Sequence, residues 1–583
     1  MVAKFLGVCV LLGVTVVGAN ESRVVFEPLE IAKTLQEKKS FRLSPSLRVT
    51  QNKTTLLYPL SFKTLLYSGD ILKGSKYPYG TILDIEGKAL QQKDGSYRIS
   101  TSQDANSLLY DQDNIYLITH LENSIGAMSK TKLDLQKDTL KVISFESMNF
   151  NKLKGINNVC AGSTTPWNTH LGGEESNAES IYADKSSPLY LDCKDPLHSA
   201  KGFCKTKLQL QKYLKNEAFN VYEYGYIVEA GIADGEDIVA RHYVTGKYAP
   251  ETATITADHK TIYISDDGEN CAFFKLVLDE RVDSFSNNWK GTLYGAKLHA
   301  QEGNKRYELE WIKLGSASDA VLQKIIASRP KVTDFFDITL SPKEGYTKIE
   351  GESSYYIKIK EFKESVHFKT KEEFMQGLAF LESRKYAAIL GANVDIRKEE
   401  GITYDPKSNK LYLAISRVPN NICGAVYELH LDKNYSATRM DAIAMGKVLQ
   451  KSDSEYTKYK DEYYCHPDSI ANPDNIAYIG NNILLIGEDT SLHFNNMLFA
   501  YNTKEKTLTR IATLPTGGEV TGLELGSVQE KKLLFINTQH PFSDVCRGAD
   551  PSSKCNSEIL QNVKHEDLRG VTGYVDGLPK DIF

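Results

Sequence analysis

Carboxylate side chains recur in this sequence at the ends of short apolar segments, where they could bind metal ions. A single acid at such a position is ordinarily a solvated turn residue. Acids that converge in the fold are different, because many carboxylates cannot share a dry pocket without cations, and oxygen ligands alone favour calcium. The candidates are Glu174, Glu175, Glu251, Asp266, Asp267, Glu399, Glu400, Asp474, Glu488, Asp489 and Glu519.

Cys160 differs from these acids because a thiolate suits a transition metal better than calcium. It lies in the segment NNVCAGSTTPWNTHLGGEES (157–176), which also contains His170 and a pair of glutamates. A disulfide or a buried thiol is the alternative interpretation of Cys160. His170 and His540 also have two interpretations, as hydrogen-bonded structural residues or as ligands or bases. If Cys160 is a ligand, the chain would hold two kinds of ion.

The cysteine count indicates an oxidising compartment. The chain has nine cysteines, and eight remain after Cys9, which lies in an N-terminal apolar segment. Outside the cytoplasm, an even number of cysteines is first interpreted as disulfides. The spacing suggests the pairs Cys193 with Cys204, Cys546 with Cys555 and Cys423 with Cys465. Cys160 and Cys271 would then remain, either paired with each other or free.

Residues 1–19 have the pattern of a secretory signal peptide. Lys4 precedes an apolar run from Phe5 to Val17, and the segment ends in Val-Gly-Ala, so the mature chain should begin at Asn20. No later segment has the apolar length of a membrane span. The net charge of −5 and the absence of a dense basic run argue against a nucleic-acid partner. We expect a periplasmic or secreted monomer that is not inserted in a membrane.

Short runs of β-branched and aromatic residues recur between polar turns, which predicts an all-β protein. Each run is followed by polar or charged groups, as in a β-propeller, where one end of many equivalent strands faces a central axis. The runs are NIYLITHLEN from Asn114, KTIYISDDGEN from Lys260, KLYLAISRV from Lys410, NNILLIGEDTS from Asn481 and KKLLFINTQHP from Lys531.

Helical periodicity is confined to two segments, Ala317–Ser328 and Thr370–Leu390. The second segment opens with a Thr-Lys-Glu-Glu capping pattern. We place both in an insertion near residues 315–395, and we interpret Lys185–Lys215 as another excursion between blades. No linker rich in Pro, Gly or Ser divides the chain, so we expect one domain over residues 20–583.

Motifs in several parts of the chain resemble those of PhoX-type alkaline phosphatases. Asn158–Gly162, Thr165–Thr169 and Glu174–Glu175 resemble the family signature CAGG-TPWGTWLTCEE. Further matches follow in family order, over about residues 155–541. They are Tyr248–Ala253, Tyr263–Lys275, Glu400–Ile402 with Asp405–Pro406, Pro473–Asn475, Glu519–Gly522, and Asn537 with Gln539–Pro541.

The resemblance implies a six-bladed β-propeller that hydrolyses small-molecule phosphate monoesters with a cluster of ferric iron and calcium at one end of its channel. A phosphate monoester is a dianion, so an acidic pocket could bind it only if cations overcompensate the carboxylates. By position, the resemblance makes Cys160, Glu251, Glu400 and Asp474 iron-side ligands. It places Glu175, Asp267, Asn475 and Glu519 on calcium.

The sequence departs from the family pattern at three places. The family has Arg before Pro-Glu, whereas here Lys398 stands at that position, Arg397 precedes it and Glu399 replaces the Pro. Arg397 or Lys398 could hold the phosphate, and the sequence does not choose between them. His170 replaces an aromatic residue and Gly173 a cysteine. The N-terminal segment has no Arg-Arg pair for twin-arginine export, so a Sec-type route is the alternative.

Two other functions are compatible with the residues. One is a calcium-dependent propeller hydrolase of phosphotriesters or lactones, which would need no thiolate. The other is a non-catalytic propeller that binds a partner and has all its cysteines paired. The sequence contains no G-x-S-x-G, H-E-x-x-H, Walker or G-x-G-x-x-G motif, which argues against α/β-hydrolases, zinc proteases and nucleotide-binding enzymes.

Overall fold

The structure is a computed structural model, and it describes residues 22–176, 178–199, 201–351, 354–543 and 563–583. The expected signal peptide and the expected pair Cys546–Cys555 lie outside the described residues. Among the helices of the described residues, none is long and apolar enough to cross a membrane.

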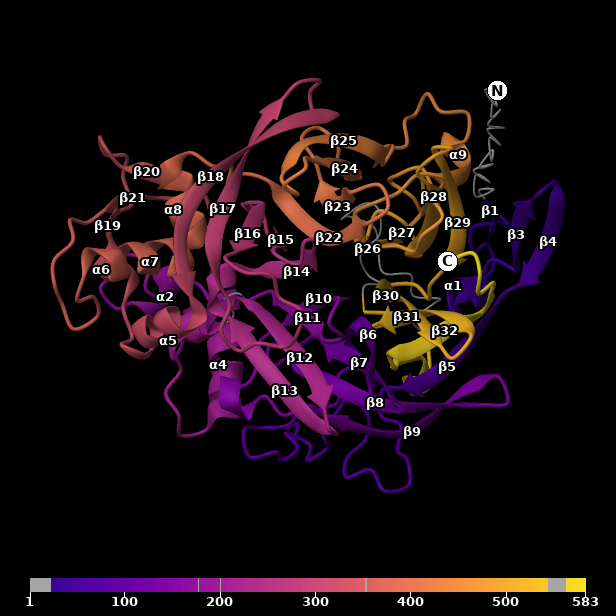
Figure 1. The fold of residues 1–583 in the computed structure, drawn as a ribbon, viewed down its shortest axis with the longest axis horizontal. Coiled ribbons are helices and arrows are strands. Elements are labelled where there is room, and N and C mark those ends of the chain that lie inside the picture. Colours follow the sequence, from indigo (N-terminus) through magenta and orange to yellow (C-terminus); the bar gives the residue numbers. More distant parts are fainter. Residues whose placement is uncertain (1–21, 177, 200, 352–353, 544–562) are drawn as a thin grey trace, which may run out of the picture.

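Six four-stranded antiparallel meanders make up most of the described chain (Figure 1). The first three are β6 (Gln103–Asp111), β7 (Asn114–Leu121), β8 (Ala127–Gln136) and β9 (Thr139–Ser147); β10 (Val159–Thr164), β11 (His170–Glu174), β12 (Ile227–Ala233) and β13 (Glu236–His242); and β14 (Pro250–Ile255), β15 (Thr261–Asp266), β16 (Phe274–Leu278) and β17 (Lys290–Ala300).

The remaining three meanders follow in chain order. They are β22 (Arg397–Asp405), β23 (Lys410–Arg417), β24 (Ala425–Leu431) and β25 (Ala437–Met445); β26 (Pro473–Tyr478), β27 (Ile483–Glu488), β28 (Met497–Asn502) and β29 (Thr507–Thr513); and β30 (Glu519–Val528), β31 (Lys531–Gln539), β32 (Val571–Leu578) and β5 (Ser61–Tyr67). A further strand, β18 (Arg306–Ser318), pairs with both β17 and β25 and joins two meanders into one sheet.

The first strand of each meander faces a common axis. Each of these strands contacts the next in the order β6, β10, β14, β22, β26, β30 and back to β6. All six strands contribute residues to one small cavity, among them Ala105, Ala161, Thr252 and Gly401. A closed ring of inner strands is the arrangement of a β-propeller. The all-β class is therefore confirmed, and this ring supports our interpretation of six blades.

The ring is closed by a strand from the N-terminal part of the chain. β5 pairs with β32, so residues near both ends of the described chain complete one meander (Figure 1). Next to β5 lies a small sheet of β1 (Arg23–Phe26), β3 (Ser46–Gln51) and β4 (Thr54–Pro59), while β2 (Arg42–Leu43) extends the edge of β29. The hydrophobic core lies between neighbouring meanders, as where Leu108 of β6 and Phe535 of β31 share one buried cluster.

Each of the five predicted strand segments contains the second strand of a meander, namely β7, β15, β23, β27 and β31. The reason is local, because these strands are buried on both faces and require continuous apolar runs. Their polar ends all lie at the same end of the ring as the inner-strand acids described below.

Helices gather in the region between β18 and β22, as expected from the sequence (Figure 1). Thr370 caps α7 with the expected capping box. The predicted helix 370–390 is broken at Glu382, whose φ of −130° is not helical and whose carboxylate accepts a hydrogen bond from Tyr222. The elements here are α5 (Asp319–Ala327), α6 (Val332–Phe335), β19 (Phe336–Thr339), β20 (Thr347–Ile349), β21 (Tyr355–Ile359), α7 (Lys371–Leu381) and α8 (Ser383–Leu390).

The other described helices are short or lie in the excursion before β12. They are α1 (Leu35–Lys38), α2 (Ser180–Ala183), α3 (Pro196–Ser199), α4 (Gly202–Leu214) and α9 (Tyr456–Tyr459), with 3-10 turns η1 (Asn151–Leu153), η2 (Val221–Glu223), η3 (Tyr243–Thr245) and η4 (His565–Leu568).

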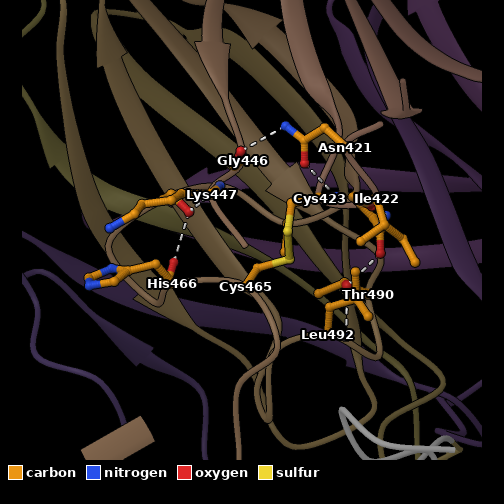
Figure 2. Close-up of a disulfide and its surroundings, with 12 residues drawn as sticks. Asn421, Ile422, Cys423, Gly446, Lys447, Cys465, His466, Thr490 and Leu492 are labelled. Carbon is orange, nitrogen blue, oxygen red and sulfur yellow. Dashed lines mark hydrogen bonds between the residues drawn. A yellow bond between two sulfur atoms is a disulfide. The ribbon is translucent and has the colours of Figure 1, made fainter. Parts of the chain in front are cut away.

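Two of the expected disulfides are present, Cys193–Cys204 and Cys423–Cys465. The second joins the loop after β23 to the segment before β26, and Figure 2 shows it between two hydrogen-bonded stretches of loop. Cys160 and Cys271 are both free thiols and do not pair with each other. The interpretation of Cys160 as a disulfide half is therefore wrong, and the thiol remains available as a ligand.

Candidate metal centre

The inner strands place their chemical groups through β-bulges. In β6, β10, β14, β22 and β26 the register shifts at the end of the strand where a candidate ligand lies. A bulge adds an unpaired residue and turns its side chain out of the regular alternation. The residues inside these five bulges include Asp104, Cys160, Glu251, Glu400 and Asp474.

A second set of groups follows the second strands. Glu122, Glu175, Asp267 and Asp489 each come directly after the last residue of β7, β11, β15 and β27. They lie opposite the bulges, because each second strand is antiparallel to its inner strand. The repeated unit of the fold therefore supplies one group from a bulge and one from the end of the neighbouring strand.

These two sets converge into four groups of possible ligands around the axis. In each group, one ligand atom per residue lies within 4.8 Å of the others. The groups are Asp104, Glu122 and Cys160; Cys160, Glu175 and Glu251; Glu251, Asp267 and Glu400; and Asp474, Asp489 and Glu519. The first three groups are linked because Cys160 and Glu251 each belong to two of them.

Burial and mutual repulsion make this cluster unstable as a set of bare carboxylates. Burial raises the pKa of Glu251 well above its ordinary value, and the nearby Glu400 charge raises it further. Burial likewise raises the pKa of Asp474, to which Glu400 contributes, and the pKa of Glu400 itself is raised to about 7. Burial and the neighbouring Asp104 also raise the pKa of the Cys160 thiol. Bound cations would reverse these shifts, since a metal ligand must be deprotonated.

Several carboxylate oxygens of the cluster have no hydrogen-bond partner in the described part of the chain and are available to bind ions. Neither carboxylate oxygen of Glu251 has a hydrogen-bond partner among the described residues, and Oδ1 of Asp104 has none either. Buried polar atoms are nearly always satisfied, so a buried carboxylate without a hydrogen-bond partner is suited to bind an ion. The donor set of carboxylates and one thiol fits a metal cluster.

Lys398 is the cation that the structure places among the acids. Its Nζ lies 2.9 Å from Oδ2 of Asp267 and 3.1 Å from Oε1 of Glu400. Burial alone would lower the pKa of Lys398, but the charges of Glu400 and Asp267 outweigh burial and raise it. Arg397 is exposed and lines a different cavity, on the opposite side of β22. Of the two candidate phosphate-binding cations, only Lys398 touches the acidic site.

Asn475 lies beside Asp474 but outside the four groups. Its Oδ1 accepts a hydrogen bond from the Gly522 backbone N–H at 3.2 Å, and its side chain lines the small axial cavity. Its Nδ2 donates to Oδ1 of Asp474 at 3.3 Å. In this arrangement Asn475 orients an acid, and its expected place on calcium stays a prediction.

In three pairs of adjacent acids, one residue forms a structural ion pair and the other belongs to the acidic site. Glu174 forms a fully buried ion pair with Arg241 at 2.7 Å, while Glu175 joins the ligand groups. Asp266 accepts from Nε of Arg384 at 2.6 Å, while Asp267 faces Lys398. Glu488 pairs in the same way with His493, at 3.1 Å, and leaves Asp489 to the site.

Asp104 and Glu122 were not among the candidates from the sequence, and Asp489 was a candidate acid that the resemblance assigned to neither metal. A signal was present in the strand run from Asn114, whose polar end contains Glu122 at the position that Asp267 has after β15. His540 occupies the corresponding position after β31, and its Nε2 lies 2.8 Å from Oε1 of Glu519. His540 therefore contacts a ligand group, and its role as a structural residue, a ligand or a base stays open.

His170 lies behind the site rather than in it. Its Nε2 contacts Nε2 of His120, and Nδ1 of His120 contacts the backbone oxygen of Cys160. Burial lowers the pKa of His120 to about 4 and that of His170 well below its ordinary value, so both rings are neutral near pH 7. This neutral pair fills the space where the related signature has an aromatic residue and supports the Cys160 backbone.

An all-β ring of meanders with buried carboxylates and one thiol on its axis defines the class, a propeller-type protein with an acidic axial site. The family model described as "Alkaline phosphatase PhoX" matches residues 114–542. A comparison with curated proteins found no match.

One of the solved structures that match shares the fold, and another aligns only weakly. Pseudomonas fluorescens PhoX, in complex with vanadate, a transition state analogue, aligns with a TM-score of 0.60 at 14% identity, covering 95% of this chain and 98% of that one. A putative 6-phosphogluconolactonase from Bacteroides uniformis aligns with a TM-score of only 0.29 at 9% identity, covering 84% and 95%. The chain belongs to the alkaline phosphatase PhoX family and is an enzyme of that class.

Proposed function

We propose that this phosphatase releases inorganic phosphate from phosphate monoesters with the help of ferric iron and calcium bound at the acidic axial site. The observation that carries the proposal is the convergence of buried carboxylates that outnumber the basic side chains beside them, Lys398 and His540. Glu251 illustrates it, since it belongs to two ligand groups and both of its oxygens lack partners. Lys398 alone is too little positive charge to attract a phosphate dianion to this many acids.

The chemistry of the ligands supports a division between the two metals. The groups that contain Cys160 combine a thiol with carboxylates, which suits iron. The group of Asp474, Asp489 and Glu519 offers only oxygen atoms, which suits calcium. When bound, these cations would supply the positive charge that attracts the phosphate and polarises its P–O bonds.

The protein's own residues position the ligands and the phosphate. Nδ2 of Asn158 donates to Glu175 at 2.9 Å and to Glu122 at 3.1 Å, which orients both carboxylates. The Ser416 hydroxyl donates to Oε1 of Glu400 at 2.5 Å. Lys398 has three N–H donors on its ammonium group, so it can turn one toward a phosphoryl oxygen while it still contacts Asp267 and Glu400.

The free thiol also bears on the alternative functions. The non-catalytic interpretation required all cysteines to be paired, and Cys160 and Cys271 are free. The calcium-only hydrolase needs no thiol at its site. The two disulfides of the described chain support our further proposal that the protein acts outside the cytoplasm.

Elemental analysis of the purified protein, combined with substitution of Cys160, tests the proposal. The wild-type protein should contain both iron and calcium and should release phosphate from glycerol phosphate. Cys160→Ser should lose iron and phosphate release while keeping the unfolding midpoint of the metal-free protein. A wild-type protein with calcium but no iron would contradict the proposed metal cluster, and Cys271→Ser, with full metal content, is the matched control.

A further inference from the structure

A large cavity lies on the other side of β22 from the acidic site. Its volume is about 1510 Å³, and it is lined by Asn270, Arg397, Arg417, Asn420, Tyr427 and Tyr464 among others. Small-molecule sites typically measure about 300–1,000 Å³, so this cavity can hold more than the leaving group of a simple ester.

Two arginines lie directly opposite each other on the cavity wall. Arg397 of β22 is the antiparallel partner of Arg417 of β23, so both side chains project from the same face of the sheet. Like charges at such a position destabilise a sheet unless an anion lies between them. The side chain of Arg397 has no hydrogen bond or ion pair with any described residue, which leaves its guanidinium free for a ligand.

One carboxylate competes weakly with a ligand for the guanidinium of Arg417. Its Nη1 lies 2.9 Å from Oε1 of Glu269, but the two side chains are 42% and 59% exposed. An ion pair this exposed contributes about 0–1 kcal/mol, so a phosphate group can displace it. Each planar guanidinium carries paired N–H donors, so Arg397 and Arg417 have the charge and the donor groups that phosphate recognition requires.

The cavity and the acidic site are connected through the same two strands. Lys398 and Ser416 are the chain neighbours of Arg397 and Arg417, and both contact Glu400 of the acidic site. A second cavity of about 520 Å³ contains the site residues Glu175 and Asp267, and it shares Asn270 with the first. The two cavities therefore border each other at Asn270.

The far wall of the cavity is held in place before any ligand binds. The disulfide Cys423–Cys465 ties the loop of Asn421 to the segment of His466 (Figure 2). Asn420 and Tyr464, which line the cavity, belong to these two segments. Nδ2 of Asn421 donates to the Gly446 carbonyl at 2.8 Å, and its Oδ1 accepts from the Cys423 N–H at 3.0 Å. A preformed wall lowers the entropic cost of binding.

We propose that Arg397 and Arg417 form a second anion subsite, which makes organic bisphosphates better substrates than monophosphates. The proposal rests on the phosphatase function proposed above. One phosphate of the substrate would occupy the acidic site and be hydrolysed, and the other would bind between the two arginines. The carbon skeleton would pass through the cavity.

Phosphate release from glucose 1,6-bisphosphate and glucose 6-phosphate tests the subsite in the metal-loaded enzyme. The measured quantity is the ratio of the two kcat/KM values. Arg417→Gln should lower this ratio about tenfold, because one charge-assisted contact to phosphate is lost. Arg417→Lys should keep part of the preference, and Glu269→Gln should raise it, because the competing carboxylate is gone.

The outcomes separate this proposal from the proposed function. If Arg417→Gln keeps its unfolding midpoint and its ratio stays within about twofold of the wild-type value, the subsite is refuted. If wild-type enzyme releases phosphate from neither compound, the proposed function is refuted. Calorimetric titration with glucose 1,6-bisphosphate then still tests the subsite, which requires Arg417→Gln to bind about tenfold more weakly than wild type.

Discussion

Replacing Glu251 by glutamine should have opposite effects on the metal-free and the metal-loaded protein. Glu251 is 1% exposed, neither of its oxygens has a hydrogen-bond partner, and it belongs to two ligand groups. Without metal, its carboxylate must either carry a proton or repel Glu400. Glutamine has nearly the same shape and no charge, so it removes this repulsion.

The magnitude follows from the burial of the group. Glutamine keeps two buried polar atoms without partners and removes only the charge, so the metal-free Glu251→Gln protein should match wild type below about pH 4.5 and exceed its stability above that pH, by about 1.4 kcal/mol per pH unit until Glu251 ionises. Because burial raises the folded-state pKa of Glu251 above its ordinary value of about 4.5, the wild-type metal-free protein should lose stability as the pH rises above about 4.5. Glu251→Gln should lose less stability than wild type over the same rise in pH.

The metal-loaded protein should respond in the other direction. Loss of a ligand shared by two groups should remove several kcal/mol of transition-state stabilisation, and about 4 kcal/mol corresponds to a roughly 10³-fold lower rate. Bound metal should also no longer raise the unfolding midpoint as it does in wild type.

Urea unfolding with EDTA and with added calcium and iron, together with phosphate release, measures both effects. Glu174→Gln is the matched control, because this equally buried acid is paired with Arg241. It should destabilise both forms by about 3–5 kcal/mol by leaving a buried charge unpaired. If Glu251→Gln behaves like Glu174→Gln, or if it binds metal like wild type, Glu251 is a structural residue and the reasoning fails.

Three further predictions concern charge, pH and covalent stability. Lys398→Met should lower kcat/KM for phosphate release by about tenfold or more, because one ammonium contact to phosphate is worth about 1.5–3 kcal/mol. Lys398→Arg should keep part of the wild-type kcat/KM. Equal losses in both variants would contradict a role of the Lys398 charge. The pKa of buried His242 is raised to about 9, because hydrogen bonds to Asp319 and Glu229 outweigh burial. The contribution of His242 to stability should be complete below about pH 6.5 and should disappear as the pH rises through about 9. Urea unfolding midpoints of wild type and His242→Asn between about pH 6 and 10 measure this contribution. Midpoints that change in parallel with pH in both proteins would refute the prediction. The disulfide Cys423–Cys465 closes a loop of sequence separation 42, and its loss should cost about 4 kcal/mol of unfolding free energy by the loop-entropy relation. The measurement is the difference in unfolding free energy between wild type and Cys423→Ser. A difference under about 1 kcal/mol would show that hydrogen bonds hold the loop instead.

The strand pattern was predictable from the sequence because burial on both faces imposes a local composition. The runs that contain β7, β15, β23, β27 and β31 are apolar and end in polar turns, and this is visible without tertiary structure. The capping box at Thr370 was visible for the same reason, since its hydrogen bonds span three residues. The break at Glu382 was not, because its cause is a hydrogen bond from Tyr222, distant in the chain.

The site was predictable only in part. The motifs identified Cys160, Glu175, Glu251, Asp267, Glu400, Asp474 and Glu519, which the structure brings into the ligand groups. Asp104 and Glu122 precede the segment where the motif matches begin and were missed. Nothing in the local sequence distinguishes Glu174 from Glu175, because the difference is the distant Arg241 that neutralises Glu174.

By itself, the sequence determined the all-β class, the positions of the strands and the chemical types of the candidate ligands. Only the tertiary structure decided which acids meet, which cation reaches them and which cysteines stay free. The physical reason is that bulges turn single side chains out of the strand pattern, and that β5 closes the ring through contacts between distant parts of the chain. Side-chain direction and long-range closure are properties of packing, and a local run of residues does not carry them.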